Sequence, residues 1–306
     1  MMQSRAASSL LAQLSRAIGH ESAQNELRWM RQTLDTPPAG ICPTARSVEE
    51  MVSRRIRGEP LQYILVLIPR PETEDWALRL ADLARDTLRS LTTNRPLSIL
   101  DLCTGTGCIP LLLLRTLPAG SAHATGIDIS EDAVSLAQEN ADLCGISVPA
   151  DNIPHPNKRS RQSEENTFKS VLADLMHPDF VRKARLAPPY DVITSNPPYI
   201  PQVEYDRLPA SVKGYEDVRA LVGDPAGVAL PTLPAADRDK GLTFYHRIAE
   251  LVRDHDLLAA EGTLALEVGD GQAQDVAAIL EGKAAMRRID VWRDPWEKER
   301  VVVAHR

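Results

Sequence analysis

The feature that most constrains the fold is a regular alternation of short apolar runs with helix-length segments. The run Ser98–Cys103 ends in a glycine-rich turn, and we predict a second strand at His123–Asp128. Apolar runs this short are typical of buried parallel strands joined by helices. Further runs of the same kind lie at 171–173, 191–195 and 263–268. The sequence therefore predicts an α/β fold with a doubly wound, mostly parallel sheet.

The segments between these runs predict the helices. They lie at 77–91, 108–117, 130–143, 242–258 and 275–280. Ser130 is a suitable N-cap, because its hydroxyl oxygen can accept an N–H of the first helical turn. The final runs, Arg288–Trp292 and Arg300–Ala304, predict an antiparallel pair that closes the sheet.

The chain before residue 77 has a different organisation. Residues 21–60 predict a small helical domain, 61–76 a short connector, and 77–306 the α/β domain. Loop insertions are expected near 147–169 and 222–240, which are polar and rich in proline. Residues 1–20 are rich in Arg and Ser and contain no acid, a pattern typical of an organelle transit peptide. Their apolar spacing also fits an ordinary first helix.

Composition narrows the function classes. The 306 residues carry a formal net charge of −7, which argues against a protein held on nucleic acid by its overall charge. The four cysteines form no C-x-x-C pair, so we expect no structural zinc, disulfide framework or other metal site. No apolar run approaches the roughly 20 residues of a membrane span. We expect a monomer without a membrane partner.

A glycine turn follows the first predicted strand, in Asp101-Leu-Cys-Thr-Gly-Thr-Gly-Cys-Ile109. Its two glycines allow a sharp turn and a close approach of a ligand to the backbone. Asp128 ends the next strand, where a carboxylate can accept both hydroxyl groups of a ribose. Pro110 replaces the third glycine of a dinucleotide fingerprint, which disfavours NAD. The acid Asp101 suits a cofactor with a cationic amino-acid tail, such as S-adenosylmethionine (SAM), better than one with a pyrophosphate. A glycine turn without a ligand is the plain alternative.

The second motif is Asn196-Pro-Pro-Tyr199, directly after the strand predicted at 191–195. Two prolines fix φ and remove two N–H donors, so the corner is rigid and offers mainly hydrogen-bond acceptors. The Asn196 side-chain oxygen and the Pro197 carbonyl are the acceptors, and Tyr199 adds an aromatic face. Converging acceptors suit the –NH₂ group of a planar amide or an amino-aromatic ring. A proline-rich turn without a ligand is the plain alternative.

Together these residues resemble the class I SAM-dependent methyltransferases, and within them the HemK/PrmC family of release factor glutamine-N5 methyltransferases. The resemblance begins near Asn25 and runs to the C-terminus, and the stretch Asn25–Met30 resembles the fungal mitochondrial branch. The motifs that carry it are Arg57-Gly-Glu-Pro-Leu-Gln-Tyr63, Ile68-Pro-Arg-Pro-Glu-Thr-Glu74, Asp101–Gly107, Asn196–Ile200 and Leu266-Glu-Val-Gly269.

The resemblance implies a role for each matching residue. The residues that would bind SAM are Cys103, Thr104, Gly105, Thr106 and Gly107 on its methionine and ribose side, Asp128 at the ribose, Leu175 beside the adenine, and Asn196. The residues that would bind the glutamine amide are Asn196, Pro197, Pro198 and Tyr199, of which Asn196, Pro197 and Tyr199 would be catalytic. Arg70–Glu74 would form part of the wall near the active site.

The implied substrate is the glutamine of the Gly-Gly-Gln (GGQ) motif in a class-1 peptide release factor, and the implied location is mitochondrial, or otherwise cytoplasmic. One alternative is an adenine-N6 methyltransferase on DNA or RNA, the only case with a nucleic-acid partner. The second is a SAM-binding protein without activity. This second alternative is considered because the connector is short: only Leu65–Leu67 separate Ile64 from Ile68, where the family has a β-hairpin.

Overall fold

The computed structural model describes residues 2–35, 47–59, 71–90, 95–148, 165–213, 216–227, 230 and 232–306. The chain divides into two compact units. The first joins Met1–Pro69 to Arg207–Val218, and the second joins Arg70–Asp206 to Arg219–Arg306. Within the described ranges, no helix is long and apolar enough to cross a bilayer.

The first unit is helical. It contains α1 (Met2–Ile18), α2 (His20–Asp35), α3 (Val48–Ile56) and the short α10 (Ala210–Lys213). Its core gathers Leu14, Ala23, Leu27, Met30, Met51 and Val52. The predicted helices on both sides of the break are confirmed, while residues 36–46 between them lie outside the described residues.

The N-terminal segment belongs to this helical core. Leu14 of α1 is fully buried, and Ile18 packs against the same cluster. The apolar spacing therefore does form a first helix. Whether residues 1–20 also direct the chain to an organelle stays a prediction.

The second unit is built on a seven-stranded sheet in the order β3-β2-β1-β4-β5-β7-β6. The strands are β1 (Leu97–Leu102), β2 (Ala122–Asp128), β3 (Thr167–Leu172), β4 (Tyr190–Ser195), β5 (Leu258–Glu267), β6 (Arg288–Arg293) and β7 (Glu299–His305). The first five pair in parallel, and β7 runs antiparallel between β5 and β6. The predicted fold class is confirmed: this is the class I SAM-dependent methyltransferase sheet.

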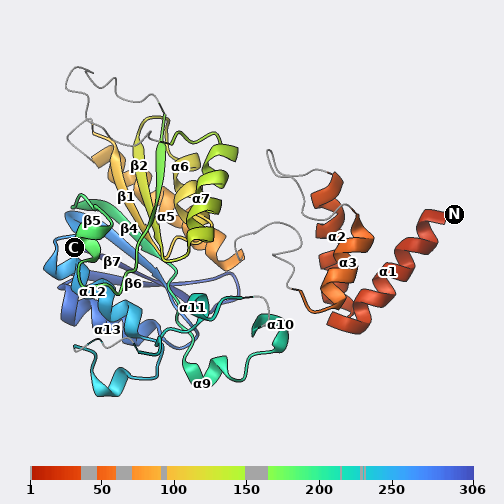
Figure 1. Ribbon diagram of the computed structural model, residues 1–306. Helices are drawn as coiled ribbons and strands as arrows, with labels where there is room; N and C mark the ends of the chain where they lie inside the picture. Colours follow the sequence, from red (N-terminus) through yellow and green to blue (C-terminus); the bar gives the residue numbers. More distant parts are fainter. Residues whose placement is uncertain are drawn as a thin grey trace. The chain divides into compact units, whose positions relative to one another are not determined.

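Helices cover both faces of the sheet (Figure 1). On one face lie α5 (Pro71–Ser90), α6 (Cys108–Thr116) and α7 (Glu131–Leu143), and on the other α12 (Thr243–Asp254) and α13 (Ala273–Ala284). All six residues of β4 are buried, as expected for a central strand. Four-residue helices lie at α8 (Phe180–Lys183), α9 (Gln202–Tyr205) and α11 (Val218–Leu221).

Several predicted boundaries differ from the structure by more than one residue. Helix α5 begins at Pro71 rather than Ala77, because proline is tolerated at the first helical position, where its missing N–H is not needed. Strand β3 begins at Thr167, so residues 167–169 are not part of the insertion. Helix α12 ends at Asp254, and Leu258 already belongs to β5. Among its described residues, the loop expected at 222–240 holds a 3₁₀ turn at Ala235–Asp237 and an isolated β-bridge from Val222 to Ile200.

Candidate active site

The predicted site residues meet at one edge of the sheet. Leu102, the last residue of β1, pairs with Ile127 of β2 and with Ser195 of β4. Ser195 pairs in turn with Leu266 of β5. These parallel strands therefore end together, so the glycine turn, Asp128 and the Asn196 corner all begin at the same edge. Ligands of open α/β sheets bind at this edge.

The glycine turn has the backbone that its residues require. Gly105 and Gly107 have φ values of 54° and 77°, in the left-handed region that glycine adopts without strain. Gly107 then caps α6. Cys103 also has a positive φ, 58°, although it carries a side chain. A Cβ on Gly126 of β2 would lie 2.6 Å from Thr104 Oγ1, so this glycine lets the turn lie against the strand.

Asp128 is tied directly to the turn. Its Oδ2 accepts the Gly105 N–H at 2.8 Å, and its Oδ1 accepts the Ser130 N–H at 3.0 Å. Each oxygen keeps a further lone pair, so the oriented carboxylate can still accept two hydroxyl groups. Ser130 also caps α7, as predicted, by accepting the Ala133 N–H at 3.3 Å. Asp128 and the glycine turn are therefore one rigid unit.

Asp101 is a buried acid beneath this turn. Its Oδ1 accepts the Thr194 hydroxyl at 2.6 Å; its Oδ2 makes no hydrogen bond of regular geometry within the described residues, although the Thr104 hydroxyl acts on the same carboxyl group and lowers its pKa. Burial raises the pKa of Asp101 to about 7, and the charge of Asp128 acts in the same direction. A buried carboxyl oxygen without a partner is costly unless a ligand meets it. Sequence reasoning noted this acid but did not place it among the binding residues.

The chemistry of these groups fits SAM. A Cβ on Gly105 would meet no described atom within 4 Å, so space lies open beside the turn. SAM carries an ammonium group, which complements the free oxygen of Asp101, and a ribose diol, which complements Asp128. The asparagine Asn140 fixes the turn from α7 by donating to the Thr106 carbonyl at 2.9 Å. The residues present therefore suit this cofactor, as predicted from the sequence.

Two cysteines flank the glycine turn. Cys103 and Cys108 are free thiols and only partly exposed. Burial raises the pKa of both thiols, that of Cys108 to about 12, and the charges of neighbouring carboxylates add to the effect. Both side chains are therefore neutral at pH 7 and line the turn as small apolar groups.

The Asn196 corner leaves β4 from a fixed point. The Ser195 hydroxyl donates to the Leu102 carbonyl at 2.7 Å, which joins the corner to β1. Pro197 and Pro198 are buried, and Asn196 is half-buried. No partner for the Asn196 carboxamide occurs in the part of the chain that the structure describes. Its role toward a substrate stays a prediction.

A further buried acid, Glu267, holds the wall segment at this edge. Its Oε2 accepts the Thr73 hydroxyl at 2.7 Å and the Trp76 indole N–H at 2.9 Å. Thr73 lies in the predicted wall segment, of which Arg70 is outside the described residues. Sequence reasoning missed the role of Glu267, although an acid inside the apolar run Leu264–Val268 signals a buried polar contact.

The predicted adenine contact, Leu175, is 5% exposed and belongs to the core beside the sheet. Its carbonyl accepts Arg247 Nε at 3.0 Å, which fixes the loop after β3. Its role toward adenine stays a prediction. Within the described ranges, no group of three His, Cys, Asp or Glu side chains could hold a metal ion.

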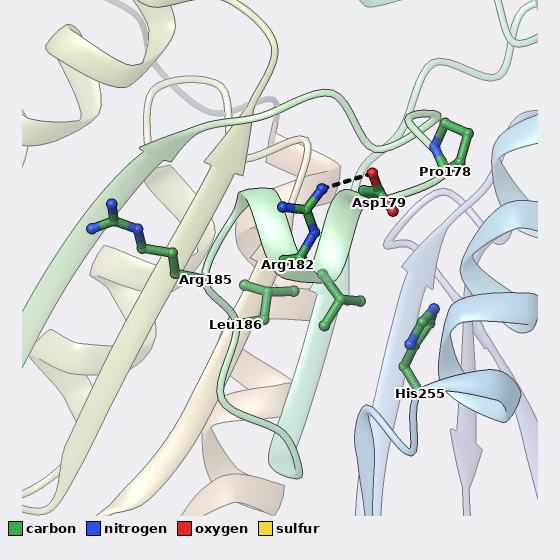
Figure 2. A pocket seen from close by; sticks show the side chains of 7 residues that line it. Pro178, Asp179, Arg182, Arg185, Leu186 and His255 are labelled. Carbon is green, nitrogen blue, oxygen red and sulfur yellow. Dashed lines mark hydrogen bonds and ion pairs between the residues drawn. The ribbon is translucent and has the colours of Figure 1, made fainter.

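A separate surface hollow of about 480 Å³ lies away from this edge (Figure 2). Leu186 and His255, which line it, precede the amino ends of β4 and β5. Arg182 and Asp179 form an exposed ion pair of 2.8 Å beside it. None of the predicted site residues lines this hollow. Exposed pairs of this kind contribute little energy, and we assign the hollow no role.

Comparison with known proteins agrees with this geometry. A methyltransferase-domain family model matches residues 94–196. A release factor glutamine methyltransferase of Thermodesulfovibrio yellowstonii is 33% identical over 279 residues, covering 85% of this chain and 81% of the relative. The chain belongs to the release factor glutamine methyltransferase family. Another member, from Bacillus anthracis, is 28% identical and covers 84% of this chain and 80% of the relative.

Among solved structures, the chain is similar to a release-factor-specific protein-(glutamine-N5) methyltransferase from Alicyclobacillus acidocaldarius. The two are 22% identical with a TM-score of 0.38, over 78% of this chain and 94% of that chain. It is also similar to a magnesium protoporphyrin IX methyltransferase from Synechocystis, solved with bound SAM, at 13% identity and a TM-score of 0.40 over 92% and 96% of the chains.

Proposed function

We propose that this chain methylates the side-chain amide nitrogen of the GGQ glutamine in a mitochondrial class-1 peptide release factor, with SAM as methyl donor. The observation that carries the proposal is the half-buried Asn196 carboxamide, which lacks a described partner and stands beside two buried prolines. Family membership supports the reaction and the class of substrate. The mitochondrial part rests on the Arg- and Ser-rich start and on the stretch Asn25–Met30.

The residues of the chain act mainly by positioning. SAM, when bound, supplies a methyl group activated on a sulfonium sulfur. The Asn196 oxygen and the Pro197 carbonyl accept the two N–H groups of the substrate amide, which orients its nitrogen. The prolines keep this corner rigid, so little entropy is lost when the amide nitrogen is aligned with the methyl group. Partial burial of the corner excludes water from the reacting groups. The amide nitrogen would form a bond to the methyl carbon as the bond from sulfur to that carbon breaks, S-adenosylhomocysteine would leave, and the nitrogen would lose one proton to water.

The decisive experiment is mass spectrometry of the GGQ peptide after incubation of a mitochondrial release factor with this protein and SAM. A gain of one methyl group on the glutamine is expected, and an adenine-containing oligonucleotide in the same assay should stay unmodified. Methylation of the oligonucleotide alone would assign the chain to adenine. Tight SAM binding with no methylated product would indicate an inactive SAM-binding protein.

The role of Asn196 is tested by substitution. Asn196→Ala removes the acceptor oxygen, so turnover should fall by about 100-fold or more while the SAM dissociation constant stays within about threefold. Asn196→Asp keeps an oxygen at the same position and should retain more activity than Asn196→Ala. Equal loss of turnover and SAM affinity in Asn196→Ala would contradict the assignment.

Location is tested separately. A fluorescent protein fused after residues 1–20 should enter mitochondria, and the same fusion with Arg5 and Arg16 replaced by Glu should not. A fusion that remains in the cytosol would overturn the mitochondrial part of the proposal and leave the reaction unaffected.

A further inference from the structure

A second carboxamide, that of Gln272, lies behind the Asn196 corner. Gln272 immediately precedes α13 and is 8% exposed. Its Oε1 accepts the Gly269 N–H at 2.9 Å. Its Nε2 donates to the Tyr199 carbonyl at 2.8 Å and to the Lys240 carbonyl at 2.8 Å. One side chain therefore joins the end of β5, the Asn196 corner and the loop before α12.

The backbone around this side chain is packed to admit it. A Cβ on Gly269 would lie 2.7 Å from Gln272 Oε1 and 2.9 Å from Tyr199 Cδ2. A Cβ on Gly241 would lie 2.0 Å from the Tyr199 carbonyl oxygen. Real Cβ atoms do not approach so closely, so both glycines are needed for the three segments to meet. The contact is a built feature of the fold and not a chance surface contact.

The position of the contact matters because of the two prolines. Pro197 and Pro198 have no N–H, so they cannot donate a hydrogen bond to the sheet. Upstream, the corner is fixed through Ser195, whose hydroxyl binds the Leu102 carbonyl. Downstream, the corner is fixed at two points. The Tyr199 carbonyl accepts Gln272 Nε2, and the Ile200 N–H donates to the Leu221 carbonyl at 2.8 Å. Gln272 therefore controls the first of these downstream attachment points.

We propose that Gln272 is a positioning residue of the methyl-transfer site, which holds the Asn196–Tyr199 corner in the conformation that receives the substrate amide. The inference rests on the proposed function, because it concerns the same corner. Gln272 acts through the Tyr199 carbonyl. A misplacement of about 1 Å in a catalytic group can cost about 100-fold in rate, so loosening this attachment should reduce turnover.

Glutamine meets the geometric demands at this position, and its nearest analogues do not. The contact needs one acceptor and two donors at the end of a two-methylene stem. Asparagine is one methylene shorter. An ionised glutamate offers no donor and would face two carbonyl oxygens. Methionine has a similar length and volume, but its thioether sulfur has no donor and is only a weak acceptor. It therefore cannot replace any of the three hydrogen bonds.

The test compares Gln272→Met and Gln272→Glu with the same substitutions at Gln274, an exposed residue of α13. Both Gln272 variants should lower kcat for release factor methylation at least about tenfold, with KM and Kd for SAM within about twofold. The Gln274 variants should behave as the wild type. Wild-type kcat in Gln272→Met, or a parallel loss of SAM affinity, would overturn the proposal.

Hydrogen exchange gives a readout that does not depend on the substrate. In Gln272→Met, amide exchange in a peptide spanning residues 199–203 should become at least about tenfold faster, while a peptide from β1 stays unchanged. Unchanged exchange at 199–203 would refute the positioning role even in an active enzyme. If the wild-type protein methylates no release factor, the proposed function fails, and the exchange measurement still decides whether Gln272 holds the corner.

Discussion

Replacing Asp101 by asparagine should stabilise the SAM-free protein at high pH while weakening SAM binding. The carboxyl group is fully buried, and burial raises its pKa from 3.8 to about 7. In the window between these values, the folded state holds a proton that the unfolded chain has lost. Stability therefore falls as the pH rises from about 4 to about 7, because ionisation is easier in the unfolded chain.

The size of the effect follows from the two pKa values. Each pH unit between the two pKa values changes the free energy of unfolding by about 1.4 kcal/mol, so the full difference corresponds to about 4 kcal/mol. Between pH 5 and pH 8 the change in the free energy of unfolding is about 3 kcal/mol. The rest of the effect lies below pH 5, and little is added above the folded-state pKa near 7. The introduced carboxamide does not ionise, so Asp101→Asn should gain about 3 kcal/mol relative to the wild type on moving from pH 5 to pH 8. Any constant cost of the new amide cancels in this comparison.

Urea unfolding of both proteins without SAM, at pH 5 and pH 8, measures this difference. Tryptophan fluorescence and far-UV circular dichroism should follow the same transition. The exposed Asp142→Asn is the control for the removal of one surface carboxylate. SAM affinity of Asp101→Asn at pH 8 should fall by about tenfold or more, since a charge-assisted contact is lost. A stability difference that is the same at both pH values would refute the argument that Asp101 is neutral in the SAM-free fold.

Three further substitutions test the scaffold of the site. Gly126→Ala places a Cβ 2.6 Å from Thr104 Oγ1, so it should cost about 1–3 kcal/mol in stability and weaken SAM binding; calorimetry measures both. Thr73→Val leaves the buried Glu267 carboxylate with one hydrogen bond fewer, and urea unfolding should show a loss of about 1–3 kcal/mol. Ser130→Ala removes the cap of α7 and should cost about 1 kcal/mol, read from the melting temperature, with SAM affinity unchanged.

The sequence predicts the fold well where burial is complete and less well at the edge of the sheet. The central strands β1 and β4 are almost fully buried, and their predicted positions agree with the structure within one residue. Strand β3 lies at an edge of the sheet and is partly exposed. Its first half therefore contains polar residues such as Lys169 and cannot be recognised as an apolar run. The pattern extends α12 through the apolar pair Leu257–Leu258, because a short apolar run does not by itself distinguish helix from strand.

The same distinction applies to the site. The link between Gly105 and Asp128 is local to two successive strands, so the spacing of the motifs predicts it. The contact between Thr73 and Glu267 joins residues 194 positions apart, and no pattern along the chain encodes such a pair. Gln272 escapes prediction for the same reason, since its partners come from three separate segments.

The elevated pKa values of Cys103 and Cys108 have a consequence for chemical damage. Peroxide and alkylating reagents attack the thiolate and react slowly with the protonated thiol. Burial and the neighbouring carboxylates favour the protonated form of both thiols at neutral pH. The two sulfur atoms beside the glycine turn should therefore react slowly with oxidants. Oxidants should modify these two positions more slowly than they would modify an ionised cysteine at the same place.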